Sequence, residues 1–199
     1  MEGDKNVFPI IKRIVDFTLS MSILIALSII FLILSLIIKL DSKGPVFFNQ
    51  KRIGKGKKEF NILKFRTMKT DAPKEMPTHL LEKPDAYITP IGKFLRKTSL
   101  DELPQLINIL KGDMSLIGPR PALWNQYDLI AERDKYKAND VLPGLTGLAQ
   151  ISGRDELPIE VKARIDGEYV KKQNSELDTR IFLKTLFSVV KSEGVKEGK

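Results

Sequence analysis

The chain has no cysteine and a single histidine, and these two shortages exclude several kinds of site. Without cysteine there can be no disulfide, no thiolate nucleophile and no cysteine-ligated metal, and one histidine cannot build a multi-histidine site. That residue, His79, lies among prolines in an expected loop, where a solvated side chain is a commoner role than catalysis. The chemistry of this protein must therefore come mainly from carboxylates, hydroxyls and cations.

Charged residues are also missing from one long run, Phe17 to Ile38. As a helix this run would be roughly 33 Å long at ~1.5 Å per residue, which is enough to cross a bilayer core. It continues into Lys39 without the cleavage site of a signal peptide, so we expect residues 1–42 to form a retained membrane anchor. Just before the run, Arg13 and Asp16 stand three positions apart, a spacing at which they would pair on a helix.

The sequence leaves the topology of this anchor open. Lys12 and Arg13 precede the run while Lys39 and Lys43 follow it, so the positive-inside rule gives no strong asymmetry. Cations at both ends suit a hairpin that returns to the same face, and Ser28 could bend a helix by bonding to a carbonyl one turn earlier. Proline would bend it more forcefully and is absent there, so a straight span remains the alternative.

Downstream of the anchor, apolar periodicity and turn residues predict several elements. We expect strands at 46–48 and 60–65, helices at 103–110 and at about 124–136, and a last helix from about 178 to a stop at Gly194. Gly112 should end the first of these helices, and Asp178 is a candidate cap for the last.

The net charge of +8 favours acidic partners without choosing among nucleic acid, anionic lipid and phosphorylated substrates. Part of this charge lies in the glycine-containing turn between the two expected strands, at Lys51, Arg52, Lys55, Lys57 and Lys58. Contact with lipid headgroups and ordinary solvation of a hairpin tip explain this basic turn equally well.

Two adjacent carboxylates, Asp101 and Glu102, stand near the expected start of the helix at 103–110. Ser99 and Glu102 fit a Ser-x-x-Glu capping box, which would make Glu102 purely structural. The helix N-terminus would also favour the ionised form of Asp101, as a carboxylate nucleophile requires. From spacing alone the structural interpretation is the stronger. A second Asp-Glu-Leu-Pro at 155–158 makes the tetrapeptide undiagnostic by itself, and we assign that copy to surface capping.

Cations from separate segments could converge on phosphates, which favours a functional interpretation of the carboxylate pair. They are Arg96 just upstream of the pair, Lys64 and Arg66 at the end of the second expected strand, and Arg120 between Pro119 and Pro121. An arginine between prolines suits a preorganised phosphate clamp, because fixed geometry lowers the cost of ordering the side chain.

Five motifs, in this order, resemble those of the bacterial sugar transferase family, the monotopic phosphoglycosyl transferases. They are Lys64 to Met68, Arg96 to Gln105, Lys111 to Pro121, Pro143 to Gln150, and Ser152 to Arg154. The resemblance implies an α-rich α/β fold in which a re-entrant helix-break-helix over 1–42 carries a small catalytic domain over 43–199. That domain would contain a short sheet and amphipathic interfacial helices, and would lie on the cytoplasmic face of the cell membrane.

The resemblance also implies an activity, the transfer of a phosphosugar from a UDP-sugar to a membrane polyprenol phosphate during glycoconjugate and polysaccharide assembly. Asp101 would attack the sugar-bearing phosphate, release UMP and hold the phosphosugar covalently, and Glu102 would assist the acceptor. Mg²⁺, with Asp101 as its ligand, would neutralise charge beside the arginines. The expected substrate contacts are Lys64, Arg66, Arg96, Arg120, Pro121 and Arg154, and residues 124–127 are expected to help choose the sugar.

Two other functions remain as alternatives. A membrane-tethered scaffold without catalysis predicts a lost nucleophile or clamp, yet Asp101, Glu102 and Arg120 are all present. A basic protein that binds nucleic acid predicts a recognised binding fold, and the sequence offers none. We therefore expect a UDP-sugar, polyprenol phosphate and membrane lipids as partners and no nucleic acid. Formation of a homo-oligomer and the identity of the sugar are left open.

Overall fold

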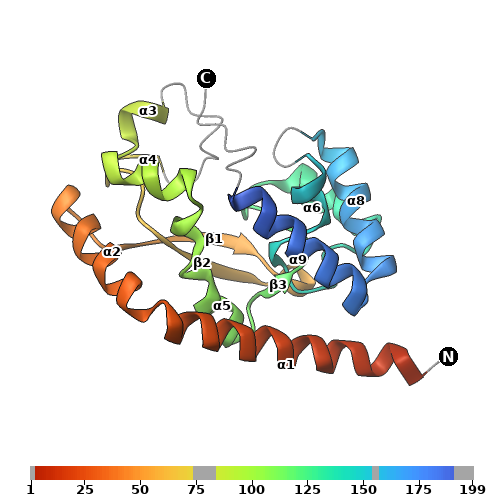
Figure 1. Cartoon of the computed structure of the whole chain (residues 1–199). Helices are drawn as coiled ribbons and strands as arrows, with labels where there is room; N and C mark the ends of the chain where they lie inside the picture. The colour runs from red at the N-terminus through yellow and green to blue at the C-terminus, as the bar shows by residue number, and fades with distance from the viewer. Residues whose placement is uncertain (1–2, 74–83, 154–156, 191–199) are drawn as a thin grey trace.

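The computed structural model describes residues 3–73, 84–153 and 157–190, and its elements are labelled in Figure 1. Two helices, α1 (Gly3–Ala26) and α2 (Ser28–Asp41), precede a hairpin of β1 (Phe47–Ile53) and β2 (Glu59–Phe65). Short elements follow: α3 (Pro84–Tyr87), α4 (Pro90–Lys97), a 3₁₀ turn (Leu100–Glu102), α5 (Gln105–Lys111) and β3 (Ser115–Ile117). The last elements are α6 (Tyr127–Asp134), β4 (Gly144–Thr146), α7 (Leu148–Ser152), α8 (Ile159–Lys172) and α9 (Ser175–Val190).

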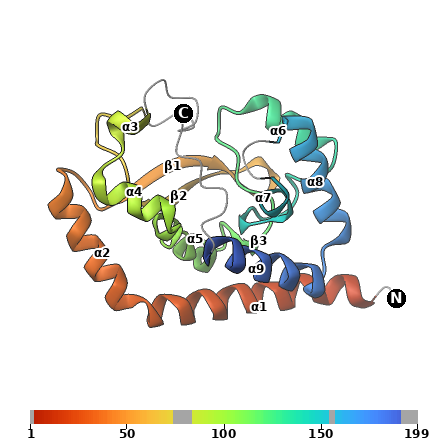
Figure 2. The same cartoon turned by 45° about the horizontal axis from the view of Figure 1, so that its top comes forward.

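The first two helices are bent by 64° where they meet, at Leu27, so that α1 runs beneath the other elements and α2 rises along one side (Figures 1 and 2). The bend lies next to Ser28, where the sequence suggested one. Helical hydrogen bonds continue through it, because the Leu27 amide donates to Ile23 O and the Phe31 amide to Leu27 O, each at 2.9 Å. Among the described residues, no single helix is long and apolar enough to cross a membrane, and this bent pair alone passes that test of length and composition.

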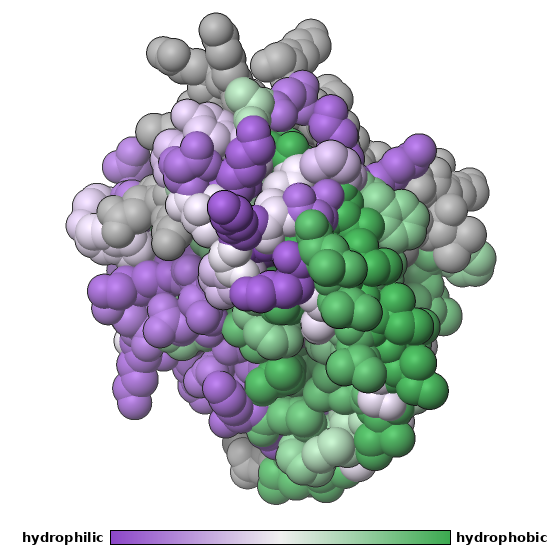
Figure 3. Space-filling model, turned by 90° about the vertical axis from the view of Figure 1, so that its left-hand side faces the viewer, coloured by the Kyte–Doolittle hydropathy of each residue, from purple (hydrophilic) through white to green (hydrophobic). Residues whose placement is uncertain are grey.

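One face of α2 is buried and the other is apolar but exposed. Leu34 and Ile38 pack with Phe65 of β2 and Leu95 of α4, and the Phe31 and Phe65 rings lie 5.2 Å apart. On the opposite side, Ile29, Leu32, Leu36 and Leu40 are at least 62% exposed. With Ile10, Ile14, Phe17 and Ile25 of α1, which are also exposed, they form what we call the outer apolar face. Figure 3 shows apolar residues gathered on one side of the molecule, and an exposed apolar surface of this extent marks an interaction site.

Two charged residues of α1 hold it against the rest of the chain. The Arg13 guanidinium donates to the carbonyls of Ile109 and Leu110 at the end of α5, at 2.6 and 2.9 Å. Asp16 is only 3% exposed and accepts from the Ser115 hydroxyl at 2.7 Å and from the next amide of β3 at 3.0 Å. The predicted pairing of Arg13 with Asp16 is therefore wrong, because each side chain satisfies polar groups of the neighbouring elements instead.

The strands form two separate two-stranded ladders. β1 and β2 are antiparallel, with Phe47 opposite Phe65 and Ile53 opposite Glu59, which confirms the predicted pair of strands. β3 and β4 are parallel, with Ser115 opposite Gly144. The larger core cluster combines both ladders with α5, α8 and α9, and it includes Ile62, Leu106, Ile109, Met114, Ile117, Tyr169 and Ile181. The prediction of an α-rich α/β fold is confirmed, with two small sheets among the described residues in place of one.

The basic turn of the hairpin packs against the end of α6 and the segment that follows it. Lys57 Nζ lies 2.9 Å from Asp134 Oδ2, and the Gly56 amide donates to Asn139 O at 2.7 Å. Part of this turn therefore contacts the protein itself, an arrangement that neither explanation offered from the sequence included.

The helix α9 begins earlier than predicted and has a different cap. Its first residue is Ser175, and the side chain of Asn174 accepts the Leu177 amide at 2.8 Å. Asp178, the predicted cap, instead pairs with Lys12 of α1 at 2.6 Å. Asp178 thus joins two helices rather than ending one.

Candidate active site

Asp101 and Glu102 lie in the 3₁₀ turn that leads from α4 to α5. The turn follows Ser99, which has a left-handed φ of 57°, and it is closed by a hydrogen bond from the Glu102 amide to Ser99 O at 3.2 Å. The Ser99 side chain makes no capping hydrogen bond there. The predicted capping box is wrong, because a capping serine needs an extended backbone to aim its oxygen at the following amides.

Glu102 joins two cations that come from other segments. Its Oε1 accepts from Lys64 Nζ of β2 at 2.6 Å and from Arg120 Nη2, in the loop after β3, at 2.9 Å. Lys64 Nζ also lies 3.8 Å from Asp101 Oδ2. These four side chains, which we call the site cluster, are between 12% and 31% exposed. The structure therefore brings Asp101, Glu102, Lys64 and Arg120 together from three segments of the chain.

The two carboxyls of the site cluster have opposite electrostatic environments. Burial raises the pKa of Glu102, but Arg120 and Lys64 outweigh burial, so the pKa of Glu102 lies well below its usual range. Burial is also the largest influence on the pKa of Asp101, and it prevails there over the opposing effect of Lys64, so that pKa is raised. The sequence predicted that a helix N-terminus would favour the ionised form of Asp101, and burial acts in the opposite direction. Neighbouring acidic groups whose pKa values are shifted in opposite directions are characteristic of catalytic sites.

Arg120 stands in a loop whose start is closely packed against β4. The Gly118 amide donates to Thr146 O at 2.9 Å. A Cβ on Gly118 would lie 2.5 Å from Leu142 O, so this approach of two backbone segments requires glycine. The backbone before Arg120 is thus fixed by the parallel ladder.

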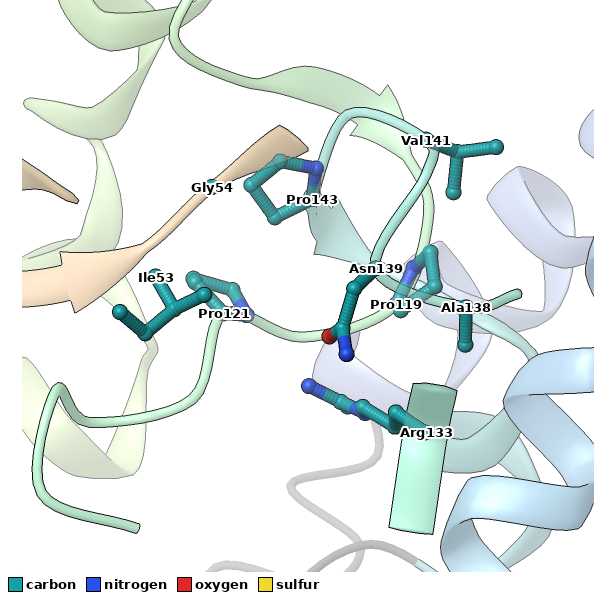
Figure 4. A pocket seen from close by; sticks show the side chains of 9 residues that line it. All are labelled: Ile53, Gly54, Pro119, Pro121, Arg133, Ala138, Asn139, Val141 and Pro143. Carbon is teal, nitrogen blue, oxygen red and sulfur yellow. The ribbon is translucent and has the colours of Figure 1, made fainter. Parts of the chain in front are cut away.

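Behind this loop, Pro119 and Pro121 line a small cavity, and the side chains of Arg133 and Asn139 point toward it (Figure 4). Arg133 is 3% exposed, and its Nε and Nη2 donate to Asp166 Oδ2 of α8 at 2.8 and 2.5 Å. The rear of the loop therefore rests on a buried ion pair that connects α6 with α8.

Arg96 lies in the last turn of α4, near the site cluster. Its Nε donates to Thr67 Oγ1 at 2.9 Å. Burial, Lys64 and Glu102 influence the pKa of Asp101 more strongly, and Arg96 lowers it further. The charge of Arg96 therefore favours the ionised form of Asp101, the predicted nucleophile.

Arg66 faces a different part of the molecule. It is 4% exposed, and its guanidinium donates to the carbonyls of Ile38, Ser42 and Lys43 at 3.1, 2.7 and 2.9 Å. Arg66 thus fastens the end of α2 to the hairpin, which is a different role from the substrate contact predicted for it. Arg154, His79 and the second Asp-Glu pair lie outside the described residues.

The acidic side chains of the site can be compared with what a Mg²⁺ ion requires of its ligands. In the described parts of the chain, no three acidic or histidine side chains lie close enough to hold a metal ion together. Mg²⁺ usually takes one or two carboxylates and completes its shell with water and substrate phosphates. Glu102 Oε1 already accepts from two cations, whereas Asp101 has Lys64 at 3.8 Å. The donor set therefore fits a Mg²⁺ that Asp101 shares with a substrate.

Two residues that border the site were not among the predicted site residues: Gln50, which the sequence analysis did not single out, and Arg52, which it placed in the basic turn. They share a face of the hairpin with Lys64, because the register pairs Phe48 with Lys64 and side chains alternate along a strand. Arg52 Nη1 donates to Pro121 O at 3.1 Å and Nη2 donates to Gln50 Oε1 at 2.6 Å. Strand alternation could have placed Arg52 on this face, but the loop that it meets is 69 positions away in the sequence.

Comparisons with known proteins agree on one family. A sequence model of the family described as Bacterial sugar transferase matches residues 7–192. An uncharacterized sugar transferase of Bacillus subtilis (strain 168), EpsL, is 40% identical over 188 residues, which cover 94% of this chain and 91% of that protein.

Two further relatives have names that state a reaction. The undecaprenyl-phosphate glucose phosphotransferase of Komagataeibacter xylinus is 39% identical over 187 residues, covering 88% of this chain and 35% of that protein. The UDP-glucose:undecaprenyl-phosphate glucose-1-phosphate transferase of Escherichia coli (strain K12) is 39% identical over 186 residues, covering 89% and 40%. The matched region is thus less than half of each of these two longer proteins.

Proposed function

The chain belongs to the bacterial sugar transferase family, and from this premise we propose that it transfers a phosphosugar from a UDP-sugar to a membrane polyprenol phosphate. The products are a polyprenyl-diphosphate-sugar and UMP. One observation carries the proposal, the meeting of Asp101 and Glu102 with Lys64 and Arg120 from two other segments. A carboxylate nucleophile surrounded by cations suits a diphosphate substrate, and the names of two relatives specify UDP-glucose or undecaprenyl phosphate.

The proposed reaction has two displacement steps at the same phosphorus atom. An oxygen of the Asp101 carboxylate attacks the sugar-bearing phosphorus, and the bond from that phosphorus to the bridging oxygen breaks. UMP leaves with the bridging oxygen, and the phosphosugar remains on Asp101 as an acyl phosphate. A phosphate oxygen of the polyprenol phosphate then attacks, which restores the carboxylate and forms the new diphosphate.

The cations of the site cluster would stabilise the negative charge of the phosphate oxygens in these steps. Lys64 and Arg120 would bind the diphosphate oxygens, with Arg96 close enough to add to the field at Asp101. Glu102, whose carboxylate bonds both Lys64 and Arg120, would orient these cations and the acceptor phosphate. Mg²⁺, if bound by Asp101 and the substrate, would supply further neutralisation of the diphosphate.

The bent pair α1 and α2 is proposed as a re-entrant anchor over 1–42, with the catalytic domain of 43–199 on the cytoplasmic face. The support is the 64° bend together with the outer apolar face that extends along both helices. An anchor of this kind holds the site in the membrane surface, where the phosphate of a polyprenol is found.

The test is the release of UMP from a panel of UDP-sugars in the presence of polyprenol phosphate and Mg²⁺. The intact protein should release UMP with at least one sugar, and Asp101→Asn should release none. Asp128→Asn is the matched control, because this exposed aspartate of α6 lies outside the site cluster and its loss should leave the rate unchanged.

Two results would contradict the proposal. An active Asp101→Asn would remove Asp101 as the nucleophile and direct attention to Asp155. Failure of the intact protein with every sugar of the panel would favour the scaffold alternative.

A further inference from the structure

We propose that Arg52 is a positioning residue for Arg120 and that it acts by holding the carbonyl of Pro121. The inference rests on the proposed function, because it takes Arg120 as a ligand of the donor diphosphate. The Arg52 guanidinium donates to two protein groups, Pro121 O and Gln50 Oε1.

The loop around Arg120 needs outside donors. Pro119 and Pro121 have no amide hydrogen, so the backbone of these two residues can be held only through their carbonyls. Upstream, Pro119 O accepts from the Gly144 amide at 2.9 Å. Downstream, Pro121 O accepts from Arg52 Nη1 at 3.1 Å. The backbone on the two sides of Arg120 is therefore hydrogen-bonded to the parallel ladder and to the hairpin.

The hairpin that holds this loop also carries Lys64. Arg52 and Lys64 lie on one face of it, because the register pairs Arg52 with Phe60 and Lys64 with Phe48. The hairpin thus positions both cations that meet at Glu102 Oε1. It carries Lys64 itself, and it holds the loop of Arg120 through Arg52. This common support fixes the spacing of the two cations that would grip a diphosphate.

Arg52 is suited to this task by its own support. Gln50 Oε1 accepts from Nη2 at 2.6 Å while Nη1 bonds Pro121 O, so two nitrogens of one planar guanidinium point in two set directions. A lysine ammonium on a flexible stem cannot reproduce both contacts in that geometry. The next amide, Ile53 N, donates to Ala122 O at 2.9 Å and keeps the loop near the strand even without Arg52. Loss of Arg52 should therefore loosen the loop without detaching it.

A double-mutant cycle on the full chain tests whether Arg52 acts through Arg120. The proteins are the wild type, Arg52→Ala, Arg120→Lys and the double variant, all in the same detergent with Mg²⁺, and the readout is the dissociation constant of UDP by calorimetry. Arg52→Ala should weaken UDP binding about tenfold in the wild-type background, the factor to which a hydrogen bond to a charged group corresponds. In the Arg120→Lys background the same change should cost less than about twofold, because a flexible ammonium depends little on loop orientation.

Three further variants separate positioning from folding or charge. Lys55→Ala removes one cation from an exposed position of the same hairpin and should leave UDP binding unchanged. Arg52→Lys keeps the charge and should recover only part of the affinity. If Arg52→Ala fails to fold, Gln50→Ala replaces it in the cycle, because it removes the support of the guanidinium and should weaken UDP binding in the same Arg120-dependent way.

The outcomes are distinct. An equal loss of affinity in both backgrounds would overturn the positioning role, and so would unchanged UDP binding by Arg52→Ala. UDP-sugar turnover by the wild type together with either of these results would leave the proposed function standing. Absence of UDP binding by the wild type would overturn both the proposed function and this inference.

Discussion

The charge of a single residue, Asp101, decides whether the proposed first step can occur. The carboxyl must be ionised to attack phosphorus, but burial raises its pKa above the ordinary value of 3.8. As pH falls through that raised pKa, Asp101 takes up a proton and the rate should fall, and as pH rises above it the rate should level off. We expect the acid limb of kcat/KM for UMP release to have its midpoint above 3.8. Rates between about pH 4 and about pH 8 would measure it.

Lys64 gives this prediction its control. Lys64 lowers the pKa of Asp101, so Lys64→Gln should move the midpoint of the acid limb to higher pH, in addition to any loss of rate. Lys55→Gln removes an equal charge from an exposed part of the same hairpin and should not move it. A midpoint that stayed in place or moved down in Lys64→Gln would show that the limb reports a group other than Asp101.

At the residue scale, local patterns in the sequence singled out side chains that lie together in the structure. An acidic pair, a strand end and a proline-flanked arginine point to Asp101, Lys64 and Arg120, whose catalytic and binding roles stay predictions. The partners of Arg66 at the end of α2, 24 positions away at Ser42, could not be inferred from the residues around it. Ser99 was misassigned because a positive φ on a serine has no signal in the sequence.

At the scale of elements, the buried pair of Arg133 and Asp166 should hold α6 against α8. The two side chains are 3% and 1% exposed, so Asp166→Asn leaves a buried guanidinium without its counter-charge. We expect this change to lower the free energy of unfolding by about 3–5 kcal/mol. Thermal unfolding followed by circular dichroism would detect it as a lower Tm.

Two comparisons make this stability prediction specific. Arg180→Ala breaks an exposed pair with Glu176 on α9 and should cost only about 0.3–0.5 kcal/mol. Joint replacement of Arg133 by Met and Asp166 by Leu should recover much of the loss, because neither charge is then left unpaired. Equal Tm values for Asp166→Asn and Arg180→Ala would contradict the importance assigned to the buried pair.

Elements with local sequence signals could be predicted, whereas those shaped by distant segments of the chain could not. The hairpin and α5 were predicted because their signals are local, including the stop at Gly112, whose φ is +90°. The start of α6 was placed too early, at 124 rather than Tyr127. Residues 122–123 are engaged with the hairpin, and Gln126 accepts the Leu123 amide at 2.8 Å, so this stretch is shaped by the Arg120 loop.

At the scale of the whole molecule, the bent pair combines an apolar exterior with a polar attachment to the domain. The outer apolar face extends along both helices, while Arg13, Asp16 and Arg66 tie the same helices to α5, β3 and β2. The sequence has cations at both ends of the predicted anchor over 1–42, but it gives no bend angle; in the structure α2 lies at 64° to α1 and packs against α4 and the hairpin. We therefore expect the bent pair and the elements packed against it to move as one body.

A re-entrant anchor returns to the face from which it enters, so the N-terminus and the hairpin must lie on the same side of the membrane. The natural absence of cysteine makes this measurable, because one introduced cysteine is the sole thiol of each variant. One variant adds a cysteine before Met1, and the other replaces the exposed Lys55 of the hairpin turn. With an impermeant maleimide and sealed inside-out vesicles, we expect both to be labelled to the same extent, and both to be protected in right-side-out vesicles. UMP release by each variant is the control that the fold is intact. Labelling of the two positions from opposite sides would replace the re-entrant anchor with a spanning one, in which the bend at Leu27 lies inside the bilayer.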